Sequence, residues 1–263
     1  MNIENTLIQA NNILRTNEIK NSRLDCEILL ANSIRRDKKH LILNPKENIN
    51  THHLNKFKKL IERRKRGEPI AYLINKKEFW KYEFYVNNNV LIPRPDTELI
   101  IEQVLNIYSK ESQIQCLDIG TGSGCILLSI LKERTKFYGT GIDISKKSIH
   151  ISRLNRKRLN LNNRAKFFHS NVDNFRIGKY DLIVSNPPYI SLKDIKYLEK
   201  DVVSFEPKLA LSGGLDGFTE IKKVVKKART LIKKNGKFIL EIGFDQKNKV
   251  INLLKDKGFY INS

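Results

Sequence analysis

The alternation of strand-like and helical segments after residue 114 is the feature that most constrains how this chain can fold. Short apolar and β-branched runs lie at 116–119, 139–144, 165–169, 182–185 and 237–242. Segments with helical spacing of apolar residues lie at 123–133, 146–160 and 218–234. Such alternation favours a parallel sheet covered by helices on both faces. This part of the sequence therefore predicts an α/β domain.

The first 75 residues show helical periodicity without strand-like runs. Apolar residues recur at helical spacing from Ile3, a second helix is predicted after Asn21 as its N-cap, and a third from Thr51 to Gly67. Aromatic and β-branched residues at 78–92 flank three asparagines at 87–89, which predicts a β-hairpin that turns at the asparagines. We therefore expect a helical domain at 1–75, a hairpin linker at 76–92 and the α/β domain at 93–263.

Composition limits the cellular setting and leaves the partner open. The formal net charge of +21 is compatible with a polyanionic or strongly acidic partner. It is equally compatible with a bias of the whole composition, because lysine, asparagine and isoleucine are all abundant and the basic residues are dispersed. The sequence lacks a run of 18 apolar residues, a signal-peptide pattern and a C-x-x-C pair among its three cysteines. We expect a cytoplasmic protein that has neither a disulfide framework nor a metal site.

A glycine-rich turn, LDIGTGSG at 117–124, follows one predicted strand and precedes a predicted helix. Glycine allows a tight turn and a close approach of a ligand to the main chain, and the helix N-terminus supplies free N–H groups. The turn is therefore a candidate cofactor-binding element, made of Gly120, Thr121, Gly122, Ser123 and Gly124. The turn alone does not distinguish between a nucleotide, a nicotinamide cofactor and no ligand.

Asp143 ends the next predicted strand, 23 residues after Gly120. A carboxylate at this spacing can accept hydrogen bonds from both ribose hydroxyls of an adenosine-containing cofactor. The alternative is that Asp143 serves only as a helix N-cap, a position that aspartate also favours. We interpret Asp143 as a ribose-binding residue.

The motif Asn186-Pro187-Pro188-Tyr189 follows a buried strand-like run, DLIVS. Each proline forces the preceding residue out of the helical region and lacks an N–H group, so nearby carbonyls can face a ligand. The amide oxygen of Asn186 and the carbonyl of Pro187 are two acceptors that suit the two N–H donors of an –NH₂ group. Tyr189 can stack on a planar group. The alternative is an ordinary strand-ending turn with a packed tyrosine.

These motifs together resemble the class I, Rossmann-like methyltransferases that carry the N-P-P-Y signature of amino-group methylation. DNA adenine, rRNA guanine and protein glutamine methyltransferases share that signature. A finer resemblance is to the bacterial peptide chain release factor glutamine methyltransferases, the HemK or PrmC family. It rests on GEPIAY at 67–72, EF at 78–79, VLIPRPDTEL at 90–99, FEPKLAL at 205–211, GGLDG at 213–217 and EIGFDQ at 241–246.

The resemblance implies S-adenosylmethionine as the cofactor. Gly120 to Gly124 would hold its methionine end, Asp143 its ribose, and Asn186 would also line the cofactor site. Val172, in an Asn-Val pair where the family commonly has Asp-Trp, would pack on the adenine. The resemblance also implies a final antiparallel strand after residue 258, for which this sequence leaves little length.

The implied substrate is the glutamine of the Gly-Gly-Gln motif of peptide chain release factors. Asn186 to Tyr189 would hold its side-chain amide, with Asn186, Pro187 and Tyr189 as catalytic residues. We expect the amide nitrogen (N5) to attack the sulfonium methyl group in line. The partner would be a release factor gripped with help from the helical domain, no membrane would be involved, and nucleic acid contact is compatible with the charge but not required. Two alternatives stay open: methylation of an exocyclic amine of RNA or DNA, and a catalytically decayed basic module that binds RNA or the ribosome.

Overall fold

The computed structural model describes residues 1–261, and contacts within the chain divide it into two compact units. The first unit comprises residues 1–75 and 199–205, and the second comprises residues 76–198 and the chain from 206 onward. The short segment 199–205, which we expected in the α/β domain, therefore groups with the N-terminal helices.

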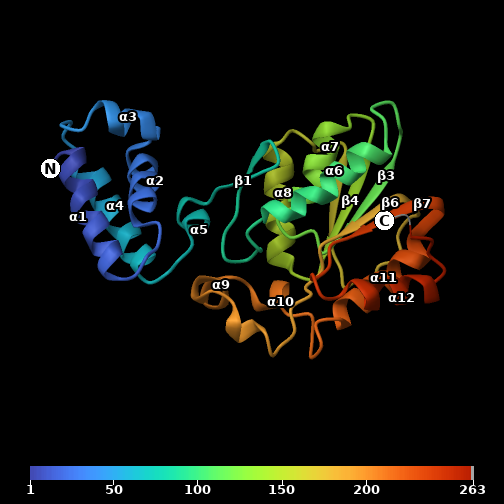
Figure 1. Cartoon of the computed structure of the whole chain (residues 1–263). Helices are drawn as coiled ribbons and strands as arrows, with labels where there is room; N and C mark the ends of the chain where they lie inside the picture. Colours follow the sequence, from blue (N-terminus) through green and yellow to red (C-terminus); the bar gives the residue numbers. More distant parts are fainter. Residues whose placement is uncertain (262–263) are drawn as a thin grey trace. The chain divides into compact units, whose positions relative to one another are not determined.

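Within the described residues, the first unit is entirely helical (Figure 1). Its helices are α1 (Ile3–Thr16), α2 (Ser22–Ile34), α3 (Lys38–Leu43), α4 (Thr51–Lys65), α5 (Ile70–Ile74) and α9 (Lys200–Phe205). The three predicted helices correspond to α1, α2 and α4. Asn21 does occupy the N-cap position of α2, but its side chain makes no capping hydrogen bond. Helices α3 and α5 were not predicted, because six and five residues are too few to show a helical period.

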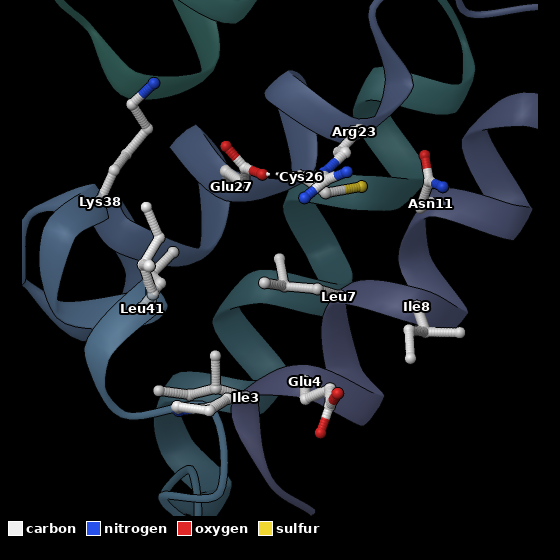
Figure 2. Close-up of a pocket in the computed structure, with 12 residues that line it drawn as sticks. Ile3, Glu4, Leu7, Ile8, Asn11, Arg23, Cys26, Glu27, Lys38 and Leu41 are labelled. Carbon is white, nitrogen blue, oxygen red and sulfur yellow. Dashed lines mark hydrogen bonds and ion pairs between the residues drawn. The ribbon is translucent and has the colours of Figure 1, made fainter.

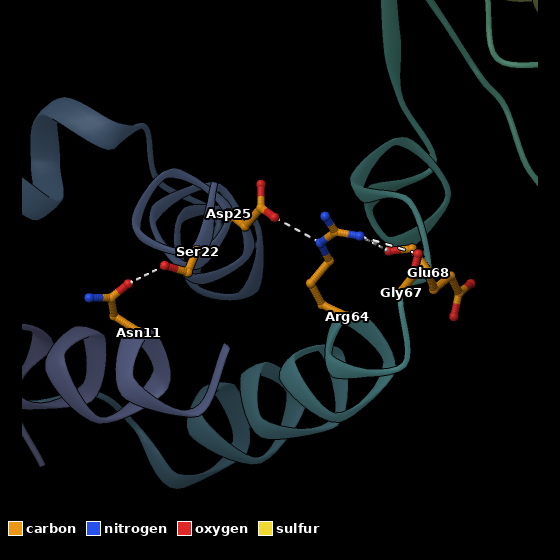
Figure 3. Close-up of polar contacts among 6 residues, drawn as sticks. All are labelled: Asn11, Ser22, Asp25, Arg64, Gly67 and Glu68. Atoms are coloured by element: carbon orange, nitrogen blue, oxygen red, sulfur yellow. Dashed lines mark hydrogen bonds and ion pairs between the residues drawn. The ribbon is translucent and has the colours of Figure 1, made fainter. Parts of the chain in front are cut away.

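A buried ion pair joins α2 to the end of α4 (Figure 3). The Nε of Arg64 donates to Oδ2 of Asp25 at 2.7 Å, and both side chains are mostly buried. Arg64 Nη1 also donates to the carbonyls of Gly67 and Glu68, at 3.2 and 3.1 Å. Burial raises the pKa of Asp25, and the guanidinium of Arg64 opposes this effect. Arg64 thereby fixes the turn that follows α4.

The hairpin lies at a different place from the one predicted. Strands β1 (Lys77–Phe79) and β2 (Tyr82–Phe84) pair antiparallel, and the chain turns at residues 80–81. The expected turn at the asparagines 87–89 was wrong, because these residues form a separate turn after the hairpin. The observed turn needs a left-handed conformation at Trp80, with φ of 57°, which is unusual for so large a side chain.

Contacts with two glutamates hold Trp80 in this conformation. Its backbone N–H donates to Oε1 of Glu98 at 2.6 Å, and its indole Nε1 donates to Oε1 of Glu133 at 2.9 Å. Asn155, which is fully buried, continues the attachment: it accepts from the N–H of Tyr85 at 2.8 Å and donates to the Tyr85 carbonyl at 3.0 Å. These contacts link the hairpin to the helices of the second unit.

The second unit contains a five-stranded parallel sheet with the strand order β5-β4-β3-β6-β7 (Figure 1). The strands are β3 (Gln115–Ile119), β4 (Tyr138–Asp143), β5 (Ala165–His169), β6 (Tyr180–Ser185) and β7 (Ile232–Leu240). This confirms the predicted α/β class. β7 starts at Ile232, earlier than the predicted 237. In the described part of the chain no strand follows β7, so the implied antiparallel strand is not seen among residues 1–261.

Alternating side chains of the central strands pack into separate hydrophobic clusters. Cys116, Leu182 and Val184 belong to a cluster with α7, whereas Leu117 and Ile183 belong to one with α11. The helices on the α7 side are α6 (Glu98–Ile107), α7 (Cys125–Glu133) and α8 (Lys146–Arg158), and those on the other side are α11 (Thr219–Leu231) and α12 (Lys247–Asp256). Three short helical segments complete the unit: η1 (Pro95–Thr97), η2 (Ile195–Tyr197) and α10 (Lys208–Leu211). In residues 1–261 no helix combines the length and apolar character that a membrane span needs.

Candidate active site

The three predicted motifs meet at the carboxyl ends of the central strands. The glycine turn follows β3, Asp143 ends β4 and Asn186 follows β6, and these strands are neighbours in the sheet. A cavity of about 270 Å³ opens there. Seven of the predicted site residues line it: Gly120, Gly122, Asp143, Val172, Asn186, Pro187 and Pro188. Thr121, Ser123, Gly124 and Tyr189 do not line the cavity.

The glycines of the turn have two different uses. Gly120 and Gly122 have φ of 77° and 54°, and an added Cβ at either position would meet no atom within 4 Å. Their open space therefore leaves room for a ligand against the main chain. At Gly124, with φ of 83°, an added Cβ would lie 3.0 Å from Leu128 and 3.2 Å from Ser152. Gly124 is thus needed for close packing at the start of α7.

Asp143 holds the glycine turn while it lines the cavity. Its Oδ2 accepts a hydrogen bond from the N–H of Gly122 at 2.9 Å, and its Oδ1 accepts from the N–H of Ser145 at 2.8 Å. Ser145 is the N-cap of α8, so capping of that helix is not the role of Asp143. Burial raises the pKa of Asp143, and the two backbone donors oppose this effect. Each carboxylate oxygen keeps a further acceptor site that a ribose hydroxyl can use.

The polar residues inside the turn support its shape. Thr121 Oγ1 donates to Oδ2 of Asp118 at 2.6 Å, and the carbonyl of Ser123 accepts from Nδ2 of Asn155 at 2.9 Å. Both Thr121 and Ser123 are buried. Direct contact between these two residues and a cofactor stays a prediction.

Asp118 predicts a pH dependence of stability. Its side chain is fully buried, Oδ1 has no hydrogen-bond partner among the described residues, and burial raises its pKa from 3.8 to about 7. Between these two pH values only the folded state keeps the proton, so stability falls as pH rises toward 7, by about 1.4 kcal/mol for each pH unit. In an Asp118→Asn variant we expect a smaller loss of the free energy of unfolding between pH 5 and pH 8, measured by denaturant titration. Parallel profiles of the two proteins would contradict this expectation, because all other titrating groups are shared.

Two acceptors of the Asn-Pro-Pro-Tyr motif are left without partners. Asn186 Nδ2 donates to Oγ1 of Thr97 at 3.0 Å. Oδ1 is therefore the atom of this amide that is left to accept a hydrogen bond. Within residues 1–261, neither Asn186 Oδ1 nor the Pro187 carbonyl accepts a hydrogen bond, and both residues line the cavity. The pair can therefore receive the two N–H groups of a planar –NH₂ donor.

Tyr189 is anchored at both ends. Its hydroxyl donates to Oε1 of Glu241 at 3.3 Å, and its carbonyl accepts from Nε2 of Gln246 at 3.1 Å. The same Nε2 donates to the carbonyl of Gly217 at 3.0 Å. Burial, with a smaller contribution from Glu241, raises the pKa of Tyr189 to about 12, so the phenol is neutral near pH 7. The Tyr189 ring is half-buried and packs against a hydrophobic cluster that includes Phe218.

A buried glutamate joins two further segments of the cavity wall. Glu206 Oε2 accepts from the N–H of Ile92 at 3.1 Å, and Oε1 forms an ion pair with Arg94. The side chain of Glu206 is only 1% exposed. Leu91 and Pro207, which adjoin the two ends of this contact, both line the cavity. Glu206 therefore fixes the spacing of two segments that are far apart in the sequence.

Sequence reasoning did not assign several residues of this region. The cavity is also lined by Asn89, Val90, Leu91, Ile119, Ile142, Ile144, Ser145, Ser148, Ser170, Asn171, Pro207, Leu209, Ala210, Ser212, Glu220, Lys223 and Val224. Thr97, Glu241 and Gln246 contact the motif without having been identified as site residues. Some of these residues lie in the family-like stretches at 90–99, 205–211 and 241–246. Such stretches indicate a related family but do not say where a residue lies in the site.

Comparisons with known proteins match both parts of the chain. Residues 5–74 match the PrmC N-terminal domain, and residues 95–204 match the methyltransferase small domain. A release factor glutamine methyltransferase of Buchnera aphidicola subsp. Schizaphis graminum is 37% identical, over 99% of this chain and 93% of the relative. A release factor glutamine methyltransferase of Caulobacter vibrioides is 35% identical, over 95% of this chain and 86% of the relative.

A third relative is longer than this chain. The bifunctional methyltransferase of Rickettsia bellii is 35% identical over 93% of this chain, which spans 49% of that protein. The chain thus spans about half the length of this relative and nearly the full length of the other two. Similarity of this extent to the two shorter proteins, together with both domain matches, establishes the relationship. The chain is a methyltransferase and belongs to the release factor glutamine methyltransferase family.

Proposed function

We propose that this chain transfers a methyl group from S-adenosylmethionine to the side-chain amide nitrogen of the glutamine in the Gly-Gly-Gln motif of peptide chain release factors. The observation that carries the proposal is the pair of unpartnered acceptors, Asn186 Oδ1 and the Pro187 carbonyl, on the wall of the cavity. The names of the two relatives that match over their nearly full length support this substrate. We place the reaction in the cytoplasm, where release factors act.

The residues that line the cavity have the chemical character that S-adenosylmethionine requires. The open main chain at Gly120 and Gly122 suits the methionine end, the acceptor sites of Asp143 suit the ribose, and Val172 offers an apolar surface to the adenine. When bound, S-adenosylmethionine supplies an electrophilic methyl group on a sulfonium. We assign the holding of this group to residues at the ends of β3, β4 and β5, and the holding of the substrate to the residues after β6.

The motif compensates for the low nucleophilicity of an amide nitrogen, whose lone pair is delocalised into the carbonyl. With both N–H groups bound to Asn186 and Pro187, the nitrogen is held in one orientation. The same two oxygens stabilise positive charge as it develops on the nitrogen. Holding reacting atoms at attack distance contributes up to about 7–11 kcal/mol in favourable cases. Because the nitrogen becomes acidic once it carries the methyl group, loss of its proton can follow the transfer.

We assign recognition of the protein substrate to the helical unit. A cavity of about 450 Å³ lies among α1, α2 and α3, with Ile3 and Leu7 on α1 and Leu41 on α3 (Figure 2). Ile8 and Ile42 also line it, and they are 54% and 74% exposed. Exposed apolar side chains around a cavity are typical of surfaces that bind another protein. The net charge of +21 would steer an acidic partner toward the chain.

A second candidate is methylation of an exocyclic amine of RNA or DNA, which the net charge of +21 favours. The two acceptors at Asn186 and Pro187 would hold such an amine in the same way. The names of the relatives point to the glutamine instead, so nucleic acid is the competing substrate to test.

Transfer of radiolabelled methyl groups to purified release factors tests the proposal, with rRNA and DNA in parallel reactions. Label on the release factor that disappears when glutamine of the Gly-Gly-Gln motif is changed to alanine would support it. Label on nucleic acid and not on the release factor would move the chain to the second candidate. Absence of label on every acceptor, together with absence of cofactor binding by calorimetry, would leave the decayed binding module.

A further inference from the structure

The amide of Asn186 has two orientations, related by a half-turn, and only one of them suits an –NH₂ substrate. With Oδ1 toward the cavity, Asn186 and the Pro187 carbonyl present two acceptors. With Nδ2 toward the cavity, a donor would face the donors of the substrate. Something in the protein must therefore select the first orientation, and the side chain that contacts the amide is that of Thr97.

Thr97 occupies the N-cap position of α6, yet its side chain makes no capping hydrogen bond. Its backbone is already helical, with φ of −65° and ψ of −18°, because η1 runs directly into α6. Here Oγ1 accepts instead from Nδ2 of Asn186, at 3.0 Å. Thr97 is 2% exposed, so water cannot readily replace this contact. The hydroxyl of Thr97 is therefore used to hold the amide nitrogen and not to begin the helix.

Glu241 approaches the motif from the end of β7. Its N–H donates to the carbonyl of Ser185 at 3.0 Å, which places it beside the residue that precedes Asn186. Its Oε1 accepts from Tyr189, and its buried Oε2 has no hydrogen-bond partner of good geometry among the described residues. Burial raises the pKa of Glu241, while the nearby side chains of Thr97, Tyr189 and Asn186 favour its charged form. Glu241 thus holds Tyr189 and the end of β6, on the two sides of Asn186 and Pro187 in the sequence.

We propose that Thr97 is a positioning residue that sets the orientation of the Asn186 amide, so that Oδ1 faces the substrate. This inference rests on the proposed function, because it specifies how the substrate nitrogen is received. Thr97 does not need to touch the substrate. Its effect on the reaction passes through Asn186.

Thr97→Val tests the inference, since valine has the shape of threonine but cannot accept from Nδ2. We expect kcat for methyl transfer to a release factor to fall about 10- to 100-fold, because an acceptor that the transition state needs is no longer oriented. The dissociation constant of the cofactor, measured by calorimetry, should change less than about threefold. Thr97→Ser keeps the hydroxyl and should restore most of the activity.

Thr230→Val is the control, because Thr230 lies in the same unit as Thr97, does not line the cavity, and its hydroxyl donates only to the Lys227 carbonyl, at 2.8 Å. It should leave kcat unchanged. A second test combines substitutions. In an Asn186→Ala background, Thr97→Val should lower kcat by less than a further factor of about three, since Thr97 acts only through the Asn186 amide. Full activity of Thr97→Val, or losses that multiply in the double variant, would overturn the inference.

A measurement without substrate separates this inference from the proposed function. In ¹⁵N-labelled protein, the side-chain amide signal of Asn186 can be assigned by its disappearance in Asn186→Ala. We expect slow hydrogen exchange of this amide in the wild type and in Thr97→Ser, and at least tenfold faster exchange in Thr97→Val. If exchange is equally fast in all three proteins, the positioning role fails. If the exchange result holds but release factors receive no label, the proposed substrate fails and the positioning role stands.

Discussion

Asn186→Ala is expected to lower kcat for methyl transfer to a release factor about 10²- to 10³-fold, the usual effect of removing one preorganised polar group from a site that stabilises developing charge. The substitution removes the acceptor at Oδ1 and leaves the Pro187 carbonyl as the second one. The nitrogen then loses both orientation and stabilisation. Single-turnover transfer of a labelled methyl group, at saturating cofactor, measures the loss directly.

Two controls test whether the loss of kcat is specific to Asn186. Asn163 is exposed and outside the residues that line the cavity, so Asn163→Ala should transfer methyl groups at the wild-type rate. The dissociation constant of the cofactor should rise less than about tenfold in Asn186→Ala, because most of the cofactor-binding residues that we propose are unchanged. An Asn186→Ala enzyme with more than half of the wild-type kcat would show that the motif does not receive the reacting nitrogen.

Asp143→Ala is expected to weaken cofactor binding about 10- to 100-fold, which corresponds to roughly 1.4–2.8 kcal/mol. The change removes the proposed acceptor for the ribose and also the acceptors for the N–H groups of Gly122 and Ser145. Both losses act in the same direction, because a turn that is no longer held must be ordered when the ligand binds. Titration calorimetry with S-adenosylmethionine gives the dissociation constant.

Asp37→Ala provides the comparison for this second prediction. Asp37 is the N-cap of α3 in the helical unit, and its Oδ1 accepts from the N–H of His40 at 2.8 Å. The variant loses a carboxylate with a backbone partner, as Asp143→Ala does, but Asp37 does not line the cavity at the ends of the central strands. It should bind the cofactor as the wild type does. Equal affinity of Asp143→Ala and the wild type would exclude Asp143 from the cofactor site.

Much of the second unit could be predicted because its signals are local. Most residues of β3 and β6 are buried, and the motifs follow these strands directly in the sequence: the glycine turn follows β3 and Asn186 follows β6. In a parallel sheet, neighbouring strands end at the same edge. The three strands are neighbours in the sheet, so Gly122, Asp143 and Asn186 line one cavity.

The residues that escaped prediction are those that act over long sequence distances. Thr97 is 89 residues from its partner Asn186, and Glu241 is 52 residues from its partner Tyr189. No local pattern records such contacts. The hairpin turn was misplaced for the same reason, since Trp80 is held by two glutamates, Glu98 and Glu133, from later helices. The asparagines at 87–89 carry the stronger local turn signal, which led to the wrong position.

The grouping of residues 199–205 with the helical unit has a consequence for how this protein can be divided. The backbone crosses between the two units after Asn75, after Leu198 and after Phe205. A gene fragment that starts at residue 76 would still encode α9, but without the N-terminal helices with which contacts group it. No single cut in the gene therefore separates the two units as the contacts define them.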